Sequence, residues 1–239
     1  MRARSLVAIT AIALLLSSCG ALPAKPEPLG PTPRGTSTAE YADDADNSGS
    51  PDGFQSAQRI AVRVRNVGCQ SLSTGSGFAL DDNTLVTNRH VIEDSSELQL
   101  ETYDGRDVAV AASTVASFSD LALVTTADKL PQVAPIAEED PEVDDLITVV
   151  GYPSGGVLTT SRGRILSTEE DPLEVNLGEV FYTSAAVEPG SSGSAVLNGE
   201  GELVGVIYAK SGSGSLFVPV STLRELLDSD ANQEPLPKC

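Results

Sequence analysis

The sequence predicts an all-β protein whose strands form two antiparallel barrels followed by one short C-terminal helix. Aromatic residues make up 4% of the chain and Trp is absent, whereas Val, Thr, Ser and Gly recur in short runs. Near residue 60, Ile60, Val62 and Val64 alternate with three arginines, which is the period of a half-buried strand. About a dozen such short segments follow one another between polar turns, and this number is sufficient for two barrels.

Further strand candidates follow the first one at short spacing. They are 77–80, 85–87, 97–103, 108–115, 121–125, 146–151, 157–166, 179–185, 194–197, 203–208 and 215–218. Turn formers such as Asn198-Gly199-Glu200-Gly201 separate several of them. One helix is predicted near the end, where Thr222 and Glu225 have the spacing of a capping box. The polar segment 137–142 predicts the boundary between an N-terminal barrel of about 56–138 and a C-terminal barrel of about 139–228.

The first eighteen residues have the pattern of an export signal. A basic start, 1–4, precedes an apolar run, 6–16, that is too short for a convincing membrane span. The run ends in Leu16-Ser17-Ser18-Cys19, which resembles the bacterial lipobox. That resemblance implies that Cys19 is diacylated and begins the mature chain, and the alternative is an ordinary secretory signal with an incidental Cys. Lipid chains would anchor the protein outside the cytoplasm at the cell membrane.

Residues 19–55 are expected to be a lipidated Cys and a flexible linker. Pro, Ser, Thr, Gly and Asp dominate this stretch, and it lacks the apolar periodicity that would repay the entropy of ordering. The folded domain is therefore expected at 56–239. Its two cysteines, Cys69 and Cys239, can pair in an oxidising compartment, and two unpaired thiols are the alternative.

Composition argues against two classes of function. A formal charge of −19 disfavours nucleic acid as a partner, because phosphate binding needs clustered Lys and Arg. A His-rich zinc site is disfavoured because His90 is the single histidine and the cysteines have other expected roles. We therefore expect no metal and no cofactor.

Three segments carry residues suited to acyl transfer. His90 offers a base that titrates near neutral pH. Asp120 begins an apolar run, so its buried charge needs a partner, and an imidazole N–H is a suitable one. The Gly-rich segment 188–196 could expose a serine hydroxyl beside converging backbone N–H groups. Each segment has an ordinary structural alternative, and local chemistry does not separate Ser191 from Ser192.

Taken together, the three segments resemble the chymotrypsin-like peptidases, particularly the bacterial trypsin-like branch that includes the HtrA proteases. The chain order His, Asp, Ser is that of this class. The segments that match are Thr-Asn-Arg-His-Val, Asp-Leu-Ala-Leu-Val and Pro-Gly-Ser-Ser-Gly-Ser, with Gly-Ser-Gly-Phe at 75–78, and the likeness covers about 58–227. The resemblance implies two six-stranded barrels and a triad of His90, Asp120 and Ser192. It also implies an oxyanion hole formed by the amides of Gly190 and Ser192.

A narrower resemblance is to periplasmic acid-resistance proteases of the MarP type. It rests on the segment Val-Gly-Tyr-Pro-Ser-Gly-Gly at 150–156, and it implies a disulfide between Cys69 and Cys239. By analogy with the wider family, 184–188 and 208–210 form the walls of the S1 pocket, and the lack of Asp in the first wall favours small or apolar P1 residues. Ser194 and Ala195 depart from the usual Gly and Pro of the nucleophile motif.

The resemblance thus implies a monomeric serine endopeptidase whose partners are a protein or peptide substrate and, through the lipid, a membrane. Two other functions remain open. The chain could be a catalytically silent member that serves as a binding module, or it could act on esters through the same triad.

Overall fold

The computed structural model describes Asp52 and residues 54–236, all of which belong to one compact unit, 45–239. The predicted signal peptide, the predicted lipidation site Cys19, most of the predicted linker and Cys239 lie outside the described residues. Within the described part, no helix is both long and apolar enough to cross a membrane.

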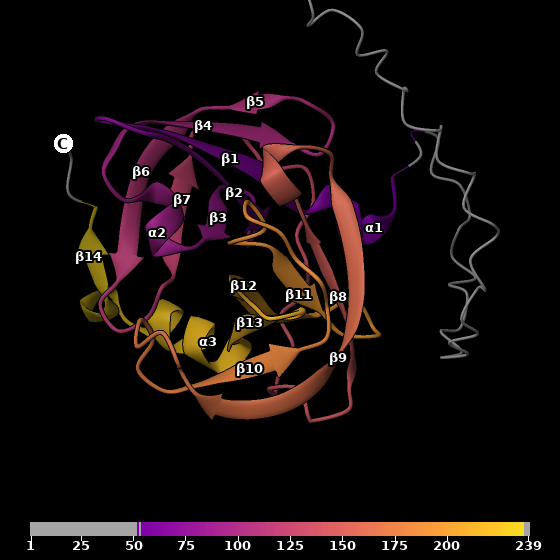
Figure 1. Ribbon diagram of the computed structural model, residues 1–239. Coiled ribbons are helices and arrows are strands. Elements are labelled where there is room, and N and C mark those ends of the chain that lie inside the picture. Colours follow the sequence, from indigo (N-terminus) through magenta and orange to yellow (C-terminus); the bar gives the residue numbers. More distant parts are fainter. Residues whose placement is uncertain (1–51, 53, 237–239) are drawn as a thin grey trace, which may run out of the picture. The chain divides into compact units, whose positions relative to one another are not determined.

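The N-terminal half is a curled antiparallel sheet of eight strands (Figure 1). The strand order is β14-β6-β7-β3-β2-β1-β4-β5. Their bounds are β1 Ala61–Gly68, β2 Leu72–Ala79, β3 Thr84–Thr87, β4 Ser95–Thr102, β5 Asp107–Val108, β6 Val110–Ala116, β7 Ala122–Thr126 and β14 Gln233–Pro235.

The C-terminal half is a closed barrel of six antiparallel strands, in the order β10-β13-β12-β11-β8-β9. Its strands are β8 Leu146–Gly151, β9 Thr159–Glu170, β10 Glu179–Thr183, β11 Ala195–Leu197, β12 Leu203–Ser211 and β13 Gly214–Pro219. The prediction of an all-β, chymotrypsin-like double barrel is confirmed. The N-terminal half differs in detail, because the short β5 and the C-terminal β14 lengthen its sheet to eight strands and its edges remain unpaired.

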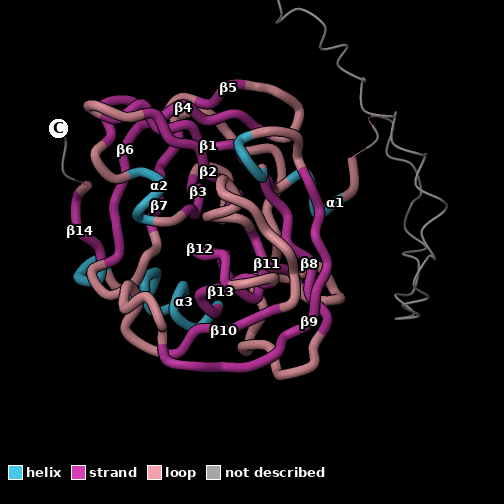
Figure 2. The backbone as a smooth tube through the Cα atoms, in the orientation of Figure 1, coloured by secondary structure: helices cyan, strands magenta, loops and turns pink. Residues whose placement is uncertain are grey.

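Helices are short and lie at the margins of the strands (Figure 2). They are α1 Ser56–Arg59, α2 Arg89–Ile92, α3 Val220–Asp228 and the 3₁₀ turns η1 Pro153–Gly155 and η2 Asp230–Asn232. The capping box predicted at Thr222 is wrong, since α3 begins two residues earlier, directly after Pro219. Instead, Asp140 of the inter-barrel segment accepts a hydrogen bond from the Ser221 N–H at 2.9 Å. This distant carboxylate satisfies an N–H group that the first turn of the helix leaves free.

Three buried apolar clusters hold the unit together. One fills the N-terminal sheet around Val62 and Leu85, and another fills the C-terminal barrel around Phe217. The third joins the two halves, because it contains Phe78 of β2 together with Leu216 of β13 and residues of α3. The two halves are therefore packed against each other through a shared core, and the residues singled out by the sequence lie beside this junction.

Candidate active site

His90 and Asp120 are brought together by the pairing of β3 with β7. The ladder matches Thr87 with Ala122, so the α2 turn that follows β3 lies beside the residues that precede β7. Two hydrogen bonds hold the α2 turn against Asp120. Asn88 Nδ2 donates to the Asp120 carbonyl at 2.8 Å, and the His90 N–H donates to Asp120 Oδ1 at 3.0 Å. The second carboxylate oxygen, Oδ2, lies 2.6 Å from His90 Nδ1.

The environment of this pair favours a basic imidazole. The Asp120 side chain is 7% exposed, whereas the His90 side chain is 42% exposed and open to the surface. Burial lowers the pKa of His90, but the hydrogen bond and the negative charge of Asp120 raise it by more, so the pKa lies above its ordinary value of 6.5. Because Asp120 occupies Nδ1, the imidazole keeps Nε2 for contact with a substrate or a nucleophile.

The turn between β10 and β11 carries the two candidate serines in different environments. Ser191 is 4% exposed, its N–H donates to the Glu188 carbonyl at 2.9 Å, and its Oγ accepts from the Glu188 N–H at 3.4 Å. Ser192 is half-buried, and its Oγ donates to the Tyr208 carbonyl at 3.3 Å. In the described part of the chain, no hydrogen bond joins Ser192 to His90. Only Ser192 therefore presents a hydroxyl that is not engaged within its own turn.

The backbone of this turn is fixed from two sides. Pro189 O accepts from the Ser154 N–H at 2.5 Å, and Gly190 O accepts from Ser76 Oγ at 2.8 Å. In a trans peptide the carbonyl and the following N–H point in opposite directions, so the bond to Ser154 turns the Gly190 N–H away from the β8–β9 turn. Among the described residues, the N–H groups of Gly190 and Ser192 donate no hydrogen bond, and both are free to bind an anion.

Glycine is required at two positions of the turn. Gly190 has φ +95° and Gly193 has φ +86°, conformations that other residues adopt at a cost. A Cβ on Gly193 would also approach the Ser76 carbonyl oxygen to 2.0 Å. The unusual Ser194 is accommodated by a third glycine, because a Cβ on Gly151 would lie 1.8 Å from the Ser194 Oγ.

Ser76 connects three parts of the site and is fully buried. Its Oγ accepts from the Tyr152 N–H at 2.8 Å while donating to Gly190, and its N–H donates to the Ser192 carbonyl at 2.7 Å. The β2 strand of the N-terminal sheet thereby holds both the end of β8 and the serine turn. The sequence indicated this Gly-Ser-Gly-Phe strand by resemblance, but nothing in the pattern assigned a role to the hydroxyl.

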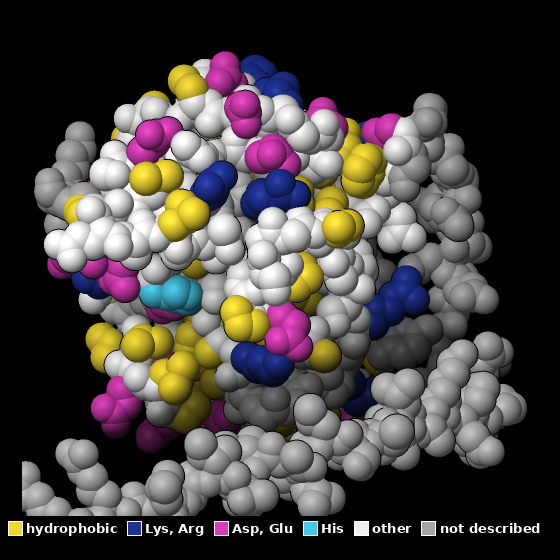
Figure 3. All heavy atoms as spheres, turned by 45° about the horizontal axis from the view of Figure 1, so that its top comes forward, with side chains coloured by type: hydrophobic (Ala, Val, Ile, Leu, Met, Phe, Trp, Pro, Cys, Tyr) yellow, Lys and Arg dark blue, Asp and Glu magenta, His cyan; other side chains and the backbone are white. Residues whose placement is uncertain are grey.

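The two walls predicted for the S1 pocket are joined by an ion pair. Lys210 Nζ lies 2.9 and 3.0 Å from the two carboxylate oxygens of Glu188. Both side chains are substantially exposed, so the pair contributes little to stability. A cavity of about 160 Å³ is lined by Ala186, Val187 and Glu188 of the first wall and by residues of β8, β9 and the serine turn, but not by residues 208–210. Figure 3 shows the histidine open at the surface with hydrophobic side chains gathered near it.

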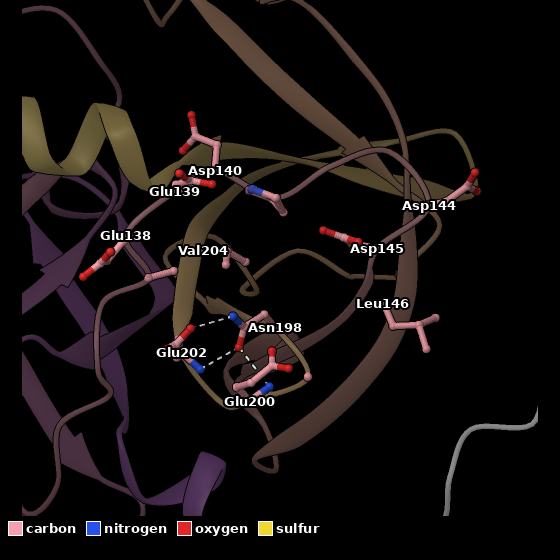
Figure 4. Close-up of a pocket in the computed structure, with 13 residues that line it drawn as sticks. Glu138, Glu139, Asp140, Asp144, Asp145, Leu146, Asn198, Glu200, Glu202 and Val204 are labelled. Carbon is pink, nitrogen blue, oxygen red and sulfur yellow. Dashed lines mark hydrogen bonds between the residues drawn. The ribbon is translucent and has the colours of Figure 1, made fainter.

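A larger cavity of about 750 Å³ lies elsewhere on the C-terminal barrel and is strongly acidic (Figure 4). Seven Asp and Glu residues line it, from segments 138–145 and 200–202. His90, Asp120 and Ser192 are not among its lining residues. Its carboxylates are part of the negative charge of the molecule. No group of His, Cys, Asp and Glu within the described residues has the arrangement of a metal site.

Sequence reasoning missed a buried polar network behind the imidazole–carboxylate pair. Asp171 and Asn176 lie in the loop between β9 and β10, and Tyr208 lies on β12. Each is at most 8% exposed. The loop has no periodic pattern and its partners are distant in sequence, so no local signal could have indicated Asp171 and Asn176, and Tyr208 was predicted only as part of an S1 wall.

Two β-barrels with an imidazole–carboxylate pair beside a glycine-bounded serine turn define a class, the chymotrypsin-like serine endopeptidase domain. The model of the family described as "Trypsin-like peptidase domain" matches residues 75–206, which is more than half of the chain. The chain therefore belongs to the trypsin-like peptidase family.

Named relatives carry similar sequences, and a solved structure has the same fold. A probable periplasmic serine endoprotease DegP-like of Hahella chejuensis is 28% identical over 66% of this chain and 36% of its own length. The protein of the same name from Chlamydia trachomatis is 32% identical over 59% of this chain and 29% of its length. The active form of the Rv3671c protease from M. tuberculosis shares the fold, with a TM-score of 0.68 and 22% identity over 76% of this chain and 85% of that one. The chain thus spans about a third of the length of the curated relatives.

Proposed function

We propose that this protein is a serine endopeptidase that cleaves peptide bonds through a triad of His90, Asp120 and Ser192. The observation that carries the proposal is the 2.6 Å contact between the single histidine and a buried carboxylate. Beside them, the serine turn offers a half-buried hydroxyl and two unengaged N–H groups. The family and the names of the relatives support the same reaction.

In the proposed reaction, the Ser192 side chain turns from the Tyr208 carbonyl toward His90 Nε2. His90 accepts the hydroxyl proton as Oγ attacks the substrate carbonyl carbon, and Asp120 stabilises the imidazolium. The N–H groups of Gly190 and Ser192 donate to the oxyanion. His90 then gives the proton to the leaving amine, the C–N bond breaks, and an acyl-enzyme remains. Water repeats the sequence, which releases the acid and restores the hydroxyl.

Ser192 rather than Ser191 is the proposed nucleophile. The Ser191 side chain is buried, and its backbone N–H and its Oγ are both engaged with Glu188. The resemblance to the chymotrypsin-like peptidases also indicated Ser192 as the nucleophile. The hydroxyl of Ser192 has a single hydrogen bond, to a backbone carbonyl, which a rotation about Cα–Cβ can release.

A fluorophosphonate probe tests this proposal, because it reacts with an activated serine without needing a known substrate. Wild-type protein should be labelled, Ser192→Ala should not, and the matched control Ser191→Ala should retain labelling. Equal reactivity of wild type and Ser192→Ala would refute the hydrolase.

A catalytically silent binding module is the second candidate, favoured by the hydrogen bond that holds Ser192 Oγ on Tyr208. The labelling experiment separates it from the active enzyme. An active protein would then be given casein, a peptide library and simple esters in parallel. We expect peptide cleavage after small or apolar P1 residues, and turnover of esters alone would identify an esterase instead.

We further propose that the protein works outside the cytoplasm as a monomer, with residues 1–18 as signal peptide, 19–55 as linker and 56–239 as the peptidase domain. Relatives named as periplasmic support the location. Lipidation at Cys19 would supply the membrane anchor. Cys19→Ala should move the protein from the membrane fraction to the soluble fraction, and unchanged fractionation would count against lipidation.

A further inference from the structure

A buried carboxylate outside the triad sits at the centre of a hydrogen-bonded network behind it. Asp171 follows β9 and is 8% exposed. Its Oδ1 accepts from the Tyr208 hydroxyl at 2.5 Å and from the Leu173 N–H at 2.9 Å. Its Oδ2 accepts from the N–H of Val175 at 3.0 Å, and from the N–H and Nδ2 of Asn176 at 2.8 and 2.9 Å. One carboxylate therefore organises the whole β9–β10 loop.

This saturation keeps Asp171 ionised. Burial raises the pKa of Asp171, but hydrogen bonds from Tyr208 and from the backbone of Leu173 and Asn176 lower it by more. A charged acceptor forms shorter and stronger hydrogen bonds than a neutral one. The loop around Asp171 is accordingly held in one arrangement.

Asn176 extends the network across the junction to the N-terminal sheet. Its Nδ2 is bound to Asp171, so its Oδ1 is the atom that faces Asp120, where it accepts the backbone N–H at 2.9 Å. Beside it, the Leu177 N–H donates to the Phe118 carbonyl at 2.8 Å. The segment that carries Asp120 is thus held by the loop of the opposite barrel.

Tyr208 extends the network to the nucleophile. Its hydroxyl is bound to Asp171, and its own carbonyl accepts the Ser192 hydroxyl at 3.3 Å. The chain of contacts runs from Asp120 through Asn176, Asp171 and Tyr208 to Ser192. Every member of this chain between the two triad residues is nine-tenths or more buried.

We propose that Asp171 is a positioning residue that holds the Asp120 backbone, through Asn176, in a fixed relation to β12 at Tyr208, where the Ser192 hydroxyl rests before it turns toward His90. The inference rests on the proposed function, which assigns Asp120 and Ser192 to one catalytic triad. Asp171 touches no substrate and acts only through its neighbours. Displacements of about 1 Å in such a site cost on the order of 100-fold in rate.

The test compares Asp171→Asn and Asn176→Ala with matched controls that also cap a turn but lie away from the triad. Asp81 accepts the N–H groups of Asn83 and Thr84 in the β2–β3 turn, so Asp81→Asn is the control for the first variant. Asn198 accepts the N–H groups of Glu200 and Glu202, so Asn198→Ala is the control for the second. All variants are assayed well below their unfolding temperatures.

We expect Asp171→Asn and Asn176→Ala to lower kcat for a peptide substrate by about 10- to 100-fold, with KM within about threefold of wild type. The controls should change neither constant by more than about twofold. If Asp171→Asn does not fold, Tyr208→Phe removes a single hydroxyl from the network and should lower kcat by about three- to tenfold. A loss no larger than in the controls, or one confined to KM, would overturn the proposal.

A spectroscopic readout keeps the inference separate from the catalytic proposal. His90 is the single histidine, so its Nδ1 proton, bound to Asp120, gives one NMR resonance that needs no activity to be observed. This resonance should shift or broaden in both network variants and stay unchanged in both controls. If the wild type fails to react with the fluorophosphonate, the proposed function fails and the resonance alone decides: an unchanged signal in Asp171→Asn and Asn176→Ala refutes the positioning role.

Discussion

His90 holds its proton to a higher pH than an isolated histidine, because the hydrogen bond and charge of Asp120 outweigh the effect of burial. A general base must be neutral, so activity should rise with pH as His90 loses its proton. We expect kcat/KM to have an acidic limb whose midpoint lies above 6.5, measured with one peptide substrate across pH 5 to 9. NMR titration of the single imidazole should give the same midpoint, and a midpoint below 6.5 would contradict this prediction.

The same pKa shift has a consequence for stability, with a definite sign. Because the folded-state pKa of His90 is raised, the charged pair with Asp120 stabilises the fold fully below the unfolded pKa of about 6.5. That contribution is lost as pH rises through the folded pKa. Asp120→Asn should remove this part of the pH dependence, as measured by urea unfolding at pH 5 and pH 9.

Removing the Ser76 hydroxyl should weaken catalysis more than binding. Ser76→Ala leaves the buried Tyr152 N–H and Gly190 carbonyl without a partner. Each lost contact costs about 1–3 kcal/mol of unfolding free energy. Because Gly190 carries a proposed oxyanion donor, kcat should fall by about tenfold or more while KM changes little. Ser73→Ala, on the exposed part of the same strand, is the control, and an equal effect there would argue against the assignment.

At this scale the sequence predicted the residue types of the candidate site better than their surroundings. His90 is the single histidine and Asp120 begins an apolar run, so both could be recognised from the sequence as candidate catalytic groups. The structure brings them into direct contact. Asp171 and Asn176 could not be recognised as part of the site, because they lie in an irregular loop of the sequence. Their roles depend on contacts with Tyr208 and Asp120, which only the folded structure shows.

At the scale of elements, short apolar runs between turn-forming residues predicted some strands closely, including strands that are buried on both faces. The 146–151 strand is observed with those bounds, and that of 85–87 is observed one residue longer. Some of the shortest elements were missed, among them α2 and β14, and β5 was not separated from the strand predicted at 108–115, because a single turn or a pair of residues has no period to detect. The start of α3 was misplaced because the N–H of Ser221 in its first turn is bound by Asp140, which lies 81 residues earlier in the chain.

The apolar face of α3 is a second element-scale feature that can be tested. Leu223 is fully buried in the cluster shared by the two halves, whereas Leu227, one turn later, is 37% exposed. Leu223→Ala should lower the free energy of unfolding by about 2–5 kcal/mol, since it removes packed methyl groups and leaves a cavity. Leu227→Ala should cost about 0.5 kcal/mol or less. Urea denaturation measures both, and equal costs would show that the helix does not pack as described.

At the scale of the whole molecule, the C-terminal end of the chain is part of the N-terminal sheet. After α3, which packs on the shared core, β14 returns to the N-terminal sheet and pairs with β6. Beside it, the Ser117 N–H donates to the Asn232 carbonyl at 3.0 Å. The last described residues therefore support the segment that leads to Asp120, a long-range closure that no local pattern in the sequence predicted.

The predicted disulfide between Cys69 and Cys239 would reinforce this closure. Joining residues so far apart would raise the free energy of unfolding by about 4–5 kcal/mol in the loop-entropy model. Mass spectrometry of non-reduced peptides should find the two cysteines joined, and reduction should lower the unfolding temperature. Free thiols at both positions would refute the pairing, and Cys69→Ser should reproduce the effect of reduction.

The division of the proposed triad between the two halves has a consequence for the life of the chain before it is folded. The ribosome completes His90 and Asp120 long before the serine turn, and the backbone of that turn is held by Ser76 and Ser154 from segments on both sides of the junction. No fragment ending before β12 contains Tyr208, against which Ser192 is held. If the proposed triad is correct, a nascent chain would carry no complete hydrolytic centre, so it could not cleave neighbouring proteins until the second barrel closes.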